Sequence, residues 1–203
     1  MPDCFALLGL PRRPWLDPED VQGHFLKLSA PVHPDRLSHA SDVEKQSSQR
    51  AFADLNAAQL QLRSPKERLL HLLELESGKK PQDLQQIPPP LVQLFVDAGN
   101  LCRAADDHLA RRSTLNSPLL KLQTFERGQE LLDQLSALQH RLHTWRDQLD
   151  AALKEADGAW EQASGADDRR RLLPQLEDLY RLYAFNTRWS QQVQERALRL
   201  SLD

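Results

Sequence analysis

Cysteine and glycine are scarce in this chain, and their scarcity excludes several kinds of site. The 203 residues include two cysteines, Cys4 and Cys102, which form no CxxC pair and no Cys/His cluster, so we expect neither a zinc site nor a disulfide scaffold. The seven glycines are not clustered, which excludes a Gly-rich phosphate-binding loop. Reduced thiols are typical of the cytoplasm, and we therefore expect a cytoplasmic protein with no cofactor and no metal.

Long apolar runs and an excess of one charge sign are also missing. No stretch reaches the roughly 18 consecutive apolar residues of a membrane-spanning helix. The first five residues lack the basic start and apolar stretch of a signal peptide. The chain has 26 Lys and Arg against 29 Asp and Glu, a net charge of -3, which gives no general attraction to nucleic acid or to an anionic membrane. We expect neither as a partner.

No catalytic constellation can be nominated from the sequence. His140 and His143 are three residues apart and so share a helix face, but further metal ligands are missing around them. No Ser/His/Asp or Cys/His set is indicated by spacing. We therefore expect no catalytic residues and no enzymatic activity.

The first half of the chain is divided by helix-starting and helix-ending residues. Asp17-Pro18-Glu19 supplies an N-cap, a first-turn proline and a first-turn acid, which predicts a helix that Pro31 and Pro34 end. A second helix is expected from about Ser41 to Leu62. Ser64-Pro65-Lys66-Glu67 predicts a third, with Glu67 completing a capping box.

The second half predicts longer helices. A polar, proline-rich stretch ends at Pro90 and reads as a linker. Helices are expected over Leu91–Arg111, over Pro118–Ala163 and after a turn at Gly165–Asp168. Leucines and tryptophans from Leu131 to Trp160 recur at steps of three and four, which predicts a coiled-coil-like antiparallel hairpin.

These patterns predict an all-α protein in two parts. The expected domains are an N-terminal domain over residues 1–76, a linker over 77–87, and a C-terminal three-helix bundle over 88–203 that contains the long antiparallel helical hairpin.

The tripeptide His33-Pro34-Asp35 lies between two of the predicted helices. On residue type alone it fits an ordinary helix-ending turn, because proline stops a helix and aspartate stabilises a turn. Four other segments change that interpretation, because together with the tripeptide they resemble, in order, the pattern of a J domain. They are Phe5-Ala6-Leu7-Leu8-Gly9-Leu10, Phe25-Leu26-Lys27-Leu28-Ser29, Phe52 to Ala58, and Leu62 to Arg68.

The continuation narrows the resemblance. A J domain at the N-terminus followed by a linker and a helical bundle is similar to HscB, the iron–sulfur co-chaperone. Arg68-Leu69-Leu70-His71-Leu72-Leu73 resembles the R-A-x-Y-L-L-like stretch of that family, and Leu91–Val96 falls where the family has an L-M-E-Q-M-E-L segment. The hairpin between residues 112 and 170 is longer than the family's.

The resemblance implies a function and the residues that perform it. J domains stimulate the ATPase of an Hsp70-type chaperone, and HscB-like proteins present the iron–sulfur scaffold protein as client. Hsp70 binding is then expected at His33, Pro34, Asp35, Lys27 and Arg36. Client binding is expected at Leu91, Leu94 and Phe95, which could equally belong to the bundle core.

Two departures from the J-domain pattern keep alternatives open. The helix before the tripeptide offers Lys27 and His24 against Asp17, Glu19 and Asp20, whereas J domains are strongly basic there. Pro31 also falls two residues before His33, where the family's helix continues. The alternatives are an adaptor with a degenerate J domain and a coiled-coil hairpin, and a general J-protein with another client.

Overall fold

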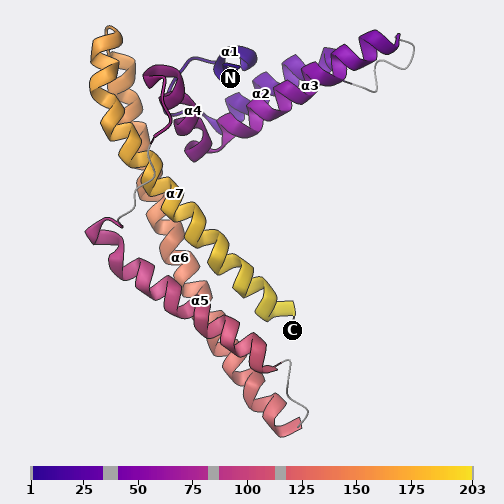
Figure 1. Cartoon of the computed structure of the whole chain (residues 1–203), viewed down its shortest axis with the longest axis vertical. Helices are drawn as coiled ribbons and strands as arrows, with labels where there is room; N and C mark the ends of the chain where they lie inside the picture. Colours follow the sequence, from indigo (N-terminus) through magenta and orange to yellow (C-terminus); the bar gives the residue numbers. More distant parts are fainter. Residues whose placement is uncertain (1, 34–40, 82–86, 113–117, 203) are drawn as a thin grey trace. The chain divides into compact units, whose positions relative to one another are not determined.

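The computed structural model describes residues 2–33, 41–81, 87–112 and 118–202, with side chains described in the last range from residue 124. In these ranges the chain forms helices and no strand, in agreement with the all-α prediction (Figure 1). The elements are α1 (Cys4–Leu8), α2 (Pro18–Ser29), η1 (Ala30–Val32), α3 (Asp42–Arg63), α4 (Pro65–Ser77), η3 (Pro89–Leu91), α5 (Val92–Arg112), α6 (Pro118–Gln162) and α7 (Ala166–Leu202).

The helix ends in the first half follow from local capping chemistry. Ser41 Oγ accepts a hydrogen bond from Glu44 N and the Glu44 carboxylate bonds back to Ser41 N, a complete capping box at the start of α3. Ser64 Oγ accepts from Glu67 N at 3.4 Å, but the Glu67 carboxylate pairs with Lys66 instead of closing the box. Gly78 ends α4 at φ 70°, a backbone conformation that glycine adopts without strain.

The chain does not leave the helical conformation at once after α2. Ser29 is the last α-helical residue, and Ala30–Val32 continue as one turn of 3-10 helix before His33 becomes extended at ψ 131°. Proline tolerates this arrangement because Pro31 stands at the second position of the turn, where no intrahelical donor is needed. The predicted end of the α-helix before Pro31 is confirmed, and η1 is the part that the sequence did not indicate.

Helices α2 and α3 pack side by side and antiparallel (Figure 1). Gln59 Nε2 donates to Gln22 Oε1 at 2.7 Å near one end of the pair, and the Phe25 and Phe52 rings lie 6.1 Å apart further along it. Residue numbers therefore rise along α2 as they fall along α3. This arrangement places the segment between the two helices at their common end.

In the second half, α5 follows η3 and then come two helices of 45 and 37 residues. The turn between α6 and α7 is shorter than expected, because α7 already begins at Ala166. Asp167 and Asp168, expected in the turn, instead occupy the first turn of α7, where acidic side chains interact favourably with the helix dipole.

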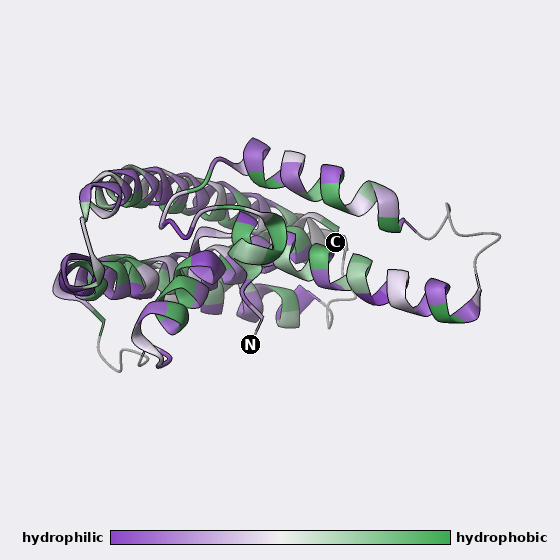
Figure 2. Ribbon diagram, turned by 90° about the horizontal axis from the view of Figure 1, so that it is seen from above, coloured by the Kyte–Doolittle hydropathy of each residue, from purple (hydrophilic) through white to green (hydrophobic). Residues whose placement is uncertain are grey.

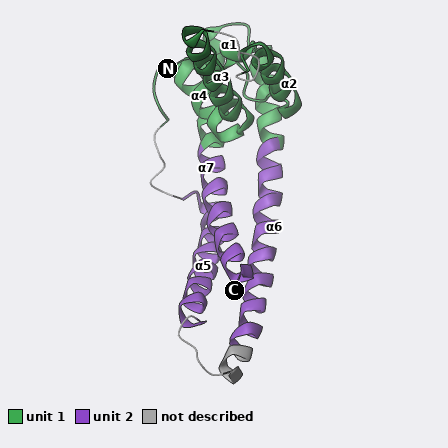
Figure 3. Ribbon diagram, turned by 90° about the vertical axis from the view of Figure 1, so that its right-hand side faces the viewer, with its two compact units in different colours: residues 1–82, 151–180 green, residues 83–150, 181–203 purple. Residues whose placement is uncertain are grey.

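The chain divides into two compact units, shown in Figure 3. Unit 1 contains residues 1–82 and 151–180, and unit 2 contains residues 83–150 and 181–203. Both α6 and α7 contribute residues to each unit. The expected domains, residues 1–76 and 88–203, are instead each one continuous stretch of the chain, and their boundaries stay a prediction.

Unit 1 joins the N-terminal segment to the ends of α6 and α7 that meet at the hairpin turn. Trp160, 1% exposed, donates from Nε1 to the backbone oxygen of Arg12 at 2.9 Å. Arg13 binds the buried Asp157 carboxylate, whose Oδ1 also accepts from Trp15 N at 3.1 Å. These polar contacts tie the segment between α1 and α2 to α6.

Unit 2 is a three-helix arrangement of α5 with parts of α6 and α7. Hydrophobic and hydrophilic residues alternate along the helices of the chain (Figure 2). The first four residues of the predicted seam, Leu131, Leu135, Leu138 and Leu142, belong to the core of unit 2. The fully or nearly buried members are Ala98, Cys102, Ala105, Leu109, Leu131, Leu135, Leu138, Leu142, Trp189, Val193 and Leu200. Within the described ranges, no helix combines the length and the apolar character needed to cross a membrane.

Candidate partner-binding site

His33 lies at the end of the α2–η1 segment, and its ring is held against α3. The imidazole makes an edge-on contact with the Phe52 ring, with centroids 5.3 Å apart and planes at 89°. The residue as a whole is half-buried, so it is packed against α3 and still partly open to solvent. Pro34, Asp35 and Arg36, the other expected Hsp70-binding residues of this segment, lie outside the described residues.

The turn before His33 is also fastened to α3. Ser48 Oγ donates to the backbone oxygen of Val32 at 3.3 Å, one residue before the histidine. Phe52 contacts both His33 and Phe25, so one α3 side chain supports the end of η1 and the inner face of α2. The geometry therefore presents His33 from a packed helix pair rather than from a free loop.

The outward face of α2 carries little positive charge. Lys27 is exposed in its last turn, as the site prediction requires, while Glu19 and Asp20 occupy its first turn. Leu26, the residue before Lys27, is an exposed apolar residue with 56% of its surface open to solvent. Leu26 and Lys27 therefore share the solvent-facing side near the end of α2.

Arg68 is a structural residue that the sequence motifs did not identify as buried. It is 1% exposed at the start of α4. Its Nη1 donates to the backbone oxygen of Leu62 at 2.6 Å and its Nε to that of Pro14 at 2.7 Å. The first bond satisfies a carbonyl at the C-terminal end of α3, and the second connects α3 and α4 to the segment before α2.

The expected client-binding residues divide into two groups. Leu91 and Leu94 are partly buried and pack against the core of unit 2. Phe95 is 44% exposed, with its ring 5.9 Å from that of Trp189. Val92 and Val96, not identified beforehand, are 46% and 42% exposed on the same helix. We call Val92, Phe95 and Val96 the α5 patch.

The acidic residue Asp97 directly follows Val96 of the α5 patch. Asp97 Oδ2 accepts a hydrogen bond from Arg141 Nη1 at 2.8 Å, and its Oδ1 accepts from Gln93 Nε2 at 2.8 Å. The hydrogen bond from Arg141 is the main reason that the pKa of Asp97 is lowered, with Gln93 as the next cause. The carboxylate thus stays ionised and is already paired with α6.

Metal-ligating residues do not gather anywhere in the part of the chain that the structure describes. No group of three or more His, Cys, Asp or Glu side chains there could hold a metal ion. The two cysteine thiols are buried, and burial raises the pKa of both Cys4 and Cys102, which disfavours the reactive thiolate.

Comparison with known proteins points to one group of co-chaperones. No protein-family model matches the chain. Over 73 residues, 36% of its length, the chain is 41% identical to the co-chaperone protein HscB homolog of Aromatoleum aromaticum and 40% identical to that of Azoarcus sp.. It is 37% identical over 81 residues to the homolog of Chromobacterium violaceum. The matched stretch spans less than half of each relative, between 41% and 46% of its length.

Solved structures resemble the chain over nearly its whole length. The chaperone HscB from Vibrio cholerae has a TM-score of 0.60, with 98% of this chain and 99% of that chain covered. Human co-chaperone HscB has a TM-score of 0.59, with 97% and 81% covered. Sequence identity is 18% in both cases, so these two likenesses establish the fold, an N-terminal J domain followed by a C-terminal helical bundle. With the fold of HscB and a stretch of clear sequence similarity to its homologues, this chain is HscB-like.

Proposed function

We propose that this chain is a co-chaperone that stimulates the ATPase of an Hsp70-type chaperone in the cytoplasm. It would perform no catalysis itself. Residues 1–76 would act as the J domain, 77–87 as a linker and 88–203 as the client-binding bundle. The client would be the scaffold protein on which iron–sulfur clusters are assembled, since the relatives with similar sequence are named HscB homologues.

The position of His33 carries this proposal. The residue follows η1 at the common end of the α2–α3 pair, and its ring is fixed against Phe52. A side chain held in this way loses little conformational freedom on binding, which favours a specific contact. His33, with Pro34 and Asp35 beyond it, would trigger ATP hydrolysis by the partner, and Lys27 and Arg36 would steer the encounter.

The adaptor alternative receives less support from the same region. It rested on the weakly basic α2, whose charge pattern is unchanged in the structure, and on Pro31, which was expected to end the helix too early for a working J domain. One 3-10 turn instead carries the chain from α2 to His33, and Ser48 holds that turn against α3. The proline therefore does not detach the histidine from the helix pair.

The α5 patch is the surface that we propose for the client. Exposed apolar side chains on consecutive helical turns commonly mark protein–protein contact sites. Phe95 would supply the central aromatic contact of this surface, with Val92 and Val96 on either side. Leu91 and Leu94, nominated with Phe95 from the sequence, would support the patch from below because they face the core of unit 2.

The test measures the steady-state ATP turnover of the Hsp70 from the same organism, with and without this chain. We expect the chain to raise the turnover several-fold and to hydrolyse no ATP alone. A further increase when the cluster scaffold protein is added would support the client assignment. A turnover that the chain leaves unchanged, at a concentration at which the Hsp70 refolds a client with a different J-protein, would contradict the proposal.

A further inference from the structure

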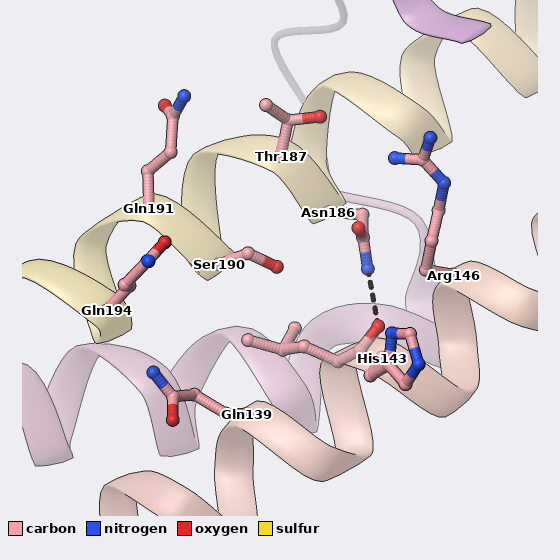
Figure 4. A pocket seen from close by; sticks show the side chains of 9 residues that line it. Gln139, His143, Arg146, Asn186, Thr187, Ser190, Gln191 and Gln194 are labelled. Carbon is pink, nitrogen blue, oxygen red and sulfur yellow. Dashed lines mark hydrogen bonds between the residues drawn. The ribbon is translucent and has the colours of Figure 1, made fainter. Parts of the chain in front are cut away.

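A polar pocket lies between α6 and α7 in unit 2. It has a volume of about 400 Å³, within the range of pockets that bind small ligands or peptide segments. The lining from α6 is Gln139, Leu142, His143 and Arg146. The lining from α7 is Asn186, Thr187, Ser190, Gln191 and Gln194 (Figure 4). None of these residues belongs to the proposed Hsp70-binding surface or to the α5 patch.

Carboxamides and hydroxyls dominate the lining, and their hydrogen-bonding capacity is largely unused. Asn186, 3% exposed, donates from Nδ2 to the backbone oxygen of Leu142 at 2.8 Å. Within the described chain its Oδ1 has no hydrogen-bond partner, and the same is true of the side chains of Gln139 and Ser190. Asn186 and Ser190 point from α7 toward α6 (Figure 4). The pocket therefore offers donors and acceptors together.

The lining is close to neutral. No acidic residue belongs to it, and the charge of Arg146 is already engaged: its Nε donates to Asp150 Oδ1 at 3.2 Å, and its guanidinium stacks 4.5 Å from the centre of the Tyr183 ring. His143 is an exposed residue whose Nε2 lies 3.9 Å from Asp147 Oδ2. A cationic ligand would lose its hydration here without meeting an acidic residue of the lining, and an anionic ligand would have to compete with Asp150 for Arg146.

A peptide main chain fits this lining better than a sugar does. Each carboxamide presents an acceptor oxygen and a donor nitrogen in one plane, the same pair of groups that a peptide bond presents. A sugar would place its C–H faces on aromatic rings, and the lining has none apart from the exposed imidazole. The rows from Gln139 to Arg146 and from Asn186 to Gln194 each run about 10 to 12 Å along their helices, the length of three to four extended residues.

We propose that this pocket binds a short, uncharged peptide segment of a partner protein in extended conformation, through its main-chain amides. The carboxamides of Gln139 and Asn186 would pair with peptide groups, and the Ser190 hydroxyl would add a further contact. Binding of this kind draws its affinity from main-chain hydrogen bonds and selects weakly among side chains. The proposal does not depend on the co-chaperone activity.

The test titrates the isotope-labelled full chain with N-acetyl-tetraalanine amide and follows the side-chain amide signals of Gln139 and Asn186 by NMR. Saturable shifts are expected. Gln139→Ala should raise the dissociation constant of the peptide by about threefold or more, as the loss of one hydrogen bond predicts. The matched control is Gln134→Ala, an exposed glutamine of α6 outside the pocket, which should leave the constant unchanged.

Two further ligands make the result decisive. The same peptide with every backbone nitrogen methylated lacks the N–H donors and should bind at least about threefold more weakly. Maltotetraose should cause no saturable shift. The inference is overturned if the unmodified peptide gives no saturable shift, if methylation or Gln139→Ala makes no difference, or if maltotetraose saturates the same signals.

Discussion

Arg13 and the buried carboxylate of Asp157 form an ion pair between residues 144 positions apart in the sequence. The guanidinium Nε donates to Asp157 Oδ1 at 3.2 Å and Nη2 donates to Oδ2, while Nη1 also pairs with Glu161 at 3.0 Å. The Asp157 side chain is 5% exposed, and its hydrogen bond is the main cause that raises the pKa of Arg13. This pair joins the segment between α1 and α2 to α6 within unit 1.

Removal of Arg13 should destabilise the protein strongly. Arg13→Ala leaves the Asp157 carboxylate buried without its cation. Such a change costs about 3 to 5 kcal/mol where both partners are buried, and the cost is smaller here because the Arg13 side chain is 31% exposed. Urea unfolding measures the loss, and Arg170→Ala is the control. Arg170 forms an ion pair with Asp167 in which both side chains are exposed, so its removal should cost less than about 0.5 kcal/mol.

A double variant separates the buried charge from lost packing. Arg13→Ala with Asp157→Asn replaces the carboxylate by an amide, which costs less to bury than a charge. The double variant should therefore be more stable than Arg13→Ala alone. If it is less stable than Arg13→Ala, the unpaired carboxylate is not the source of the destabilisation.

Two glycine substitutions should change stability in opposite directions. Gly78 ends α4 at φ 70°, where a Cβ is strained, so Gly78→Ala should lower the free energy of unfolding by about 1 kcal/mol. Gly158 lies inside α6 with open space around the position of a Cβ, so Gly158→Ala should raise it by about 0.5 to 1 kcal/mol. Equilibrium unfolding by urea compares the two variants directly. A lower free energy of unfolding for both variants would contradict the assignment of Gly158 to an open helical position.

His71 should make stability depend on pH. It is 0% exposed in α4, and its Nε2 accepts a hydrogen bond from Cys4 N at 3.0 Å. Burial lowers the pKa of His71 below 6.5, against the opposite influence of the Asp3 and Glu74 carboxylates, while Arg12 and the N-terminus lower it further. The unfolded chain therefore binds the proton more readily than the folded chain. The contribution of His71 to the free energy of unfolding is fully present above about pH 6.5 and declines as the pH falls toward the pKa of the folded state.

The pH effect can be assigned with one variant. His71→Gln keeps a side-chain acceptor for Cys4 N but cannot titrate. Urea unfolding midpoints at pH 7.5 and pH 5.5 should differ more for the native chain than for His71→Gln. Equal differences in the two proteins would show that another group is responsible.

The helix boundaries could be predicted from the sequence because capping depends on neighbouring residues. Ser41, Ser64 and Gly78 each act on backbone groups within four positions, and each marks a helix end in the structure. The heptad-like steps from Leu131 to Trp160 likewise indicated the buried face of α6, because residues three and four apart share a side of a helix.

The contacts that connect these helices could not be predicted in the same way. Arg68 and Asp157 carry charged side chains, and charged side chains are normally exposed. Their burial depends on Pro14, 54 residues from Arg68, and on Arg13, far from Asp157 along the chain. For the candidate site, the motif nominated His33 and Lys27, which stay predictions, whereas the contact between His33 and Phe52 could be seen only in the fold.

The α5 patch should be needed for client binding. Phe95→Ser removes its central aromatic side chain and should weaken binding of the cluster scaffold protein by about tenfold or more, measured by calorimetry. Phe125→Ser is the matched control, because Phe125 is 54% exposed on α6 outside the patch. Equal affinities of the two variants would remove Phe95 from the client surface. A thermal melt of both proteins checks that the Phe95 contact with Trp189 is not required for folding.

The most direct test of the account is the single-turnover rate of ATP hydrolysis by the cognate Hsp70 in the presence of this chain or its variants. His33→Gln removes the imidazole at the end of the α2–α3 pair. His140→Gln makes the same change at an exposed position of α6. We predict that the native chain and His140→Gln raise the rate constant equally and several-fold, while His33→Gln leaves it at the basal value although its melting temperature shows that it is folded. Equal stimulation by His33→Gln would contradict the central claim.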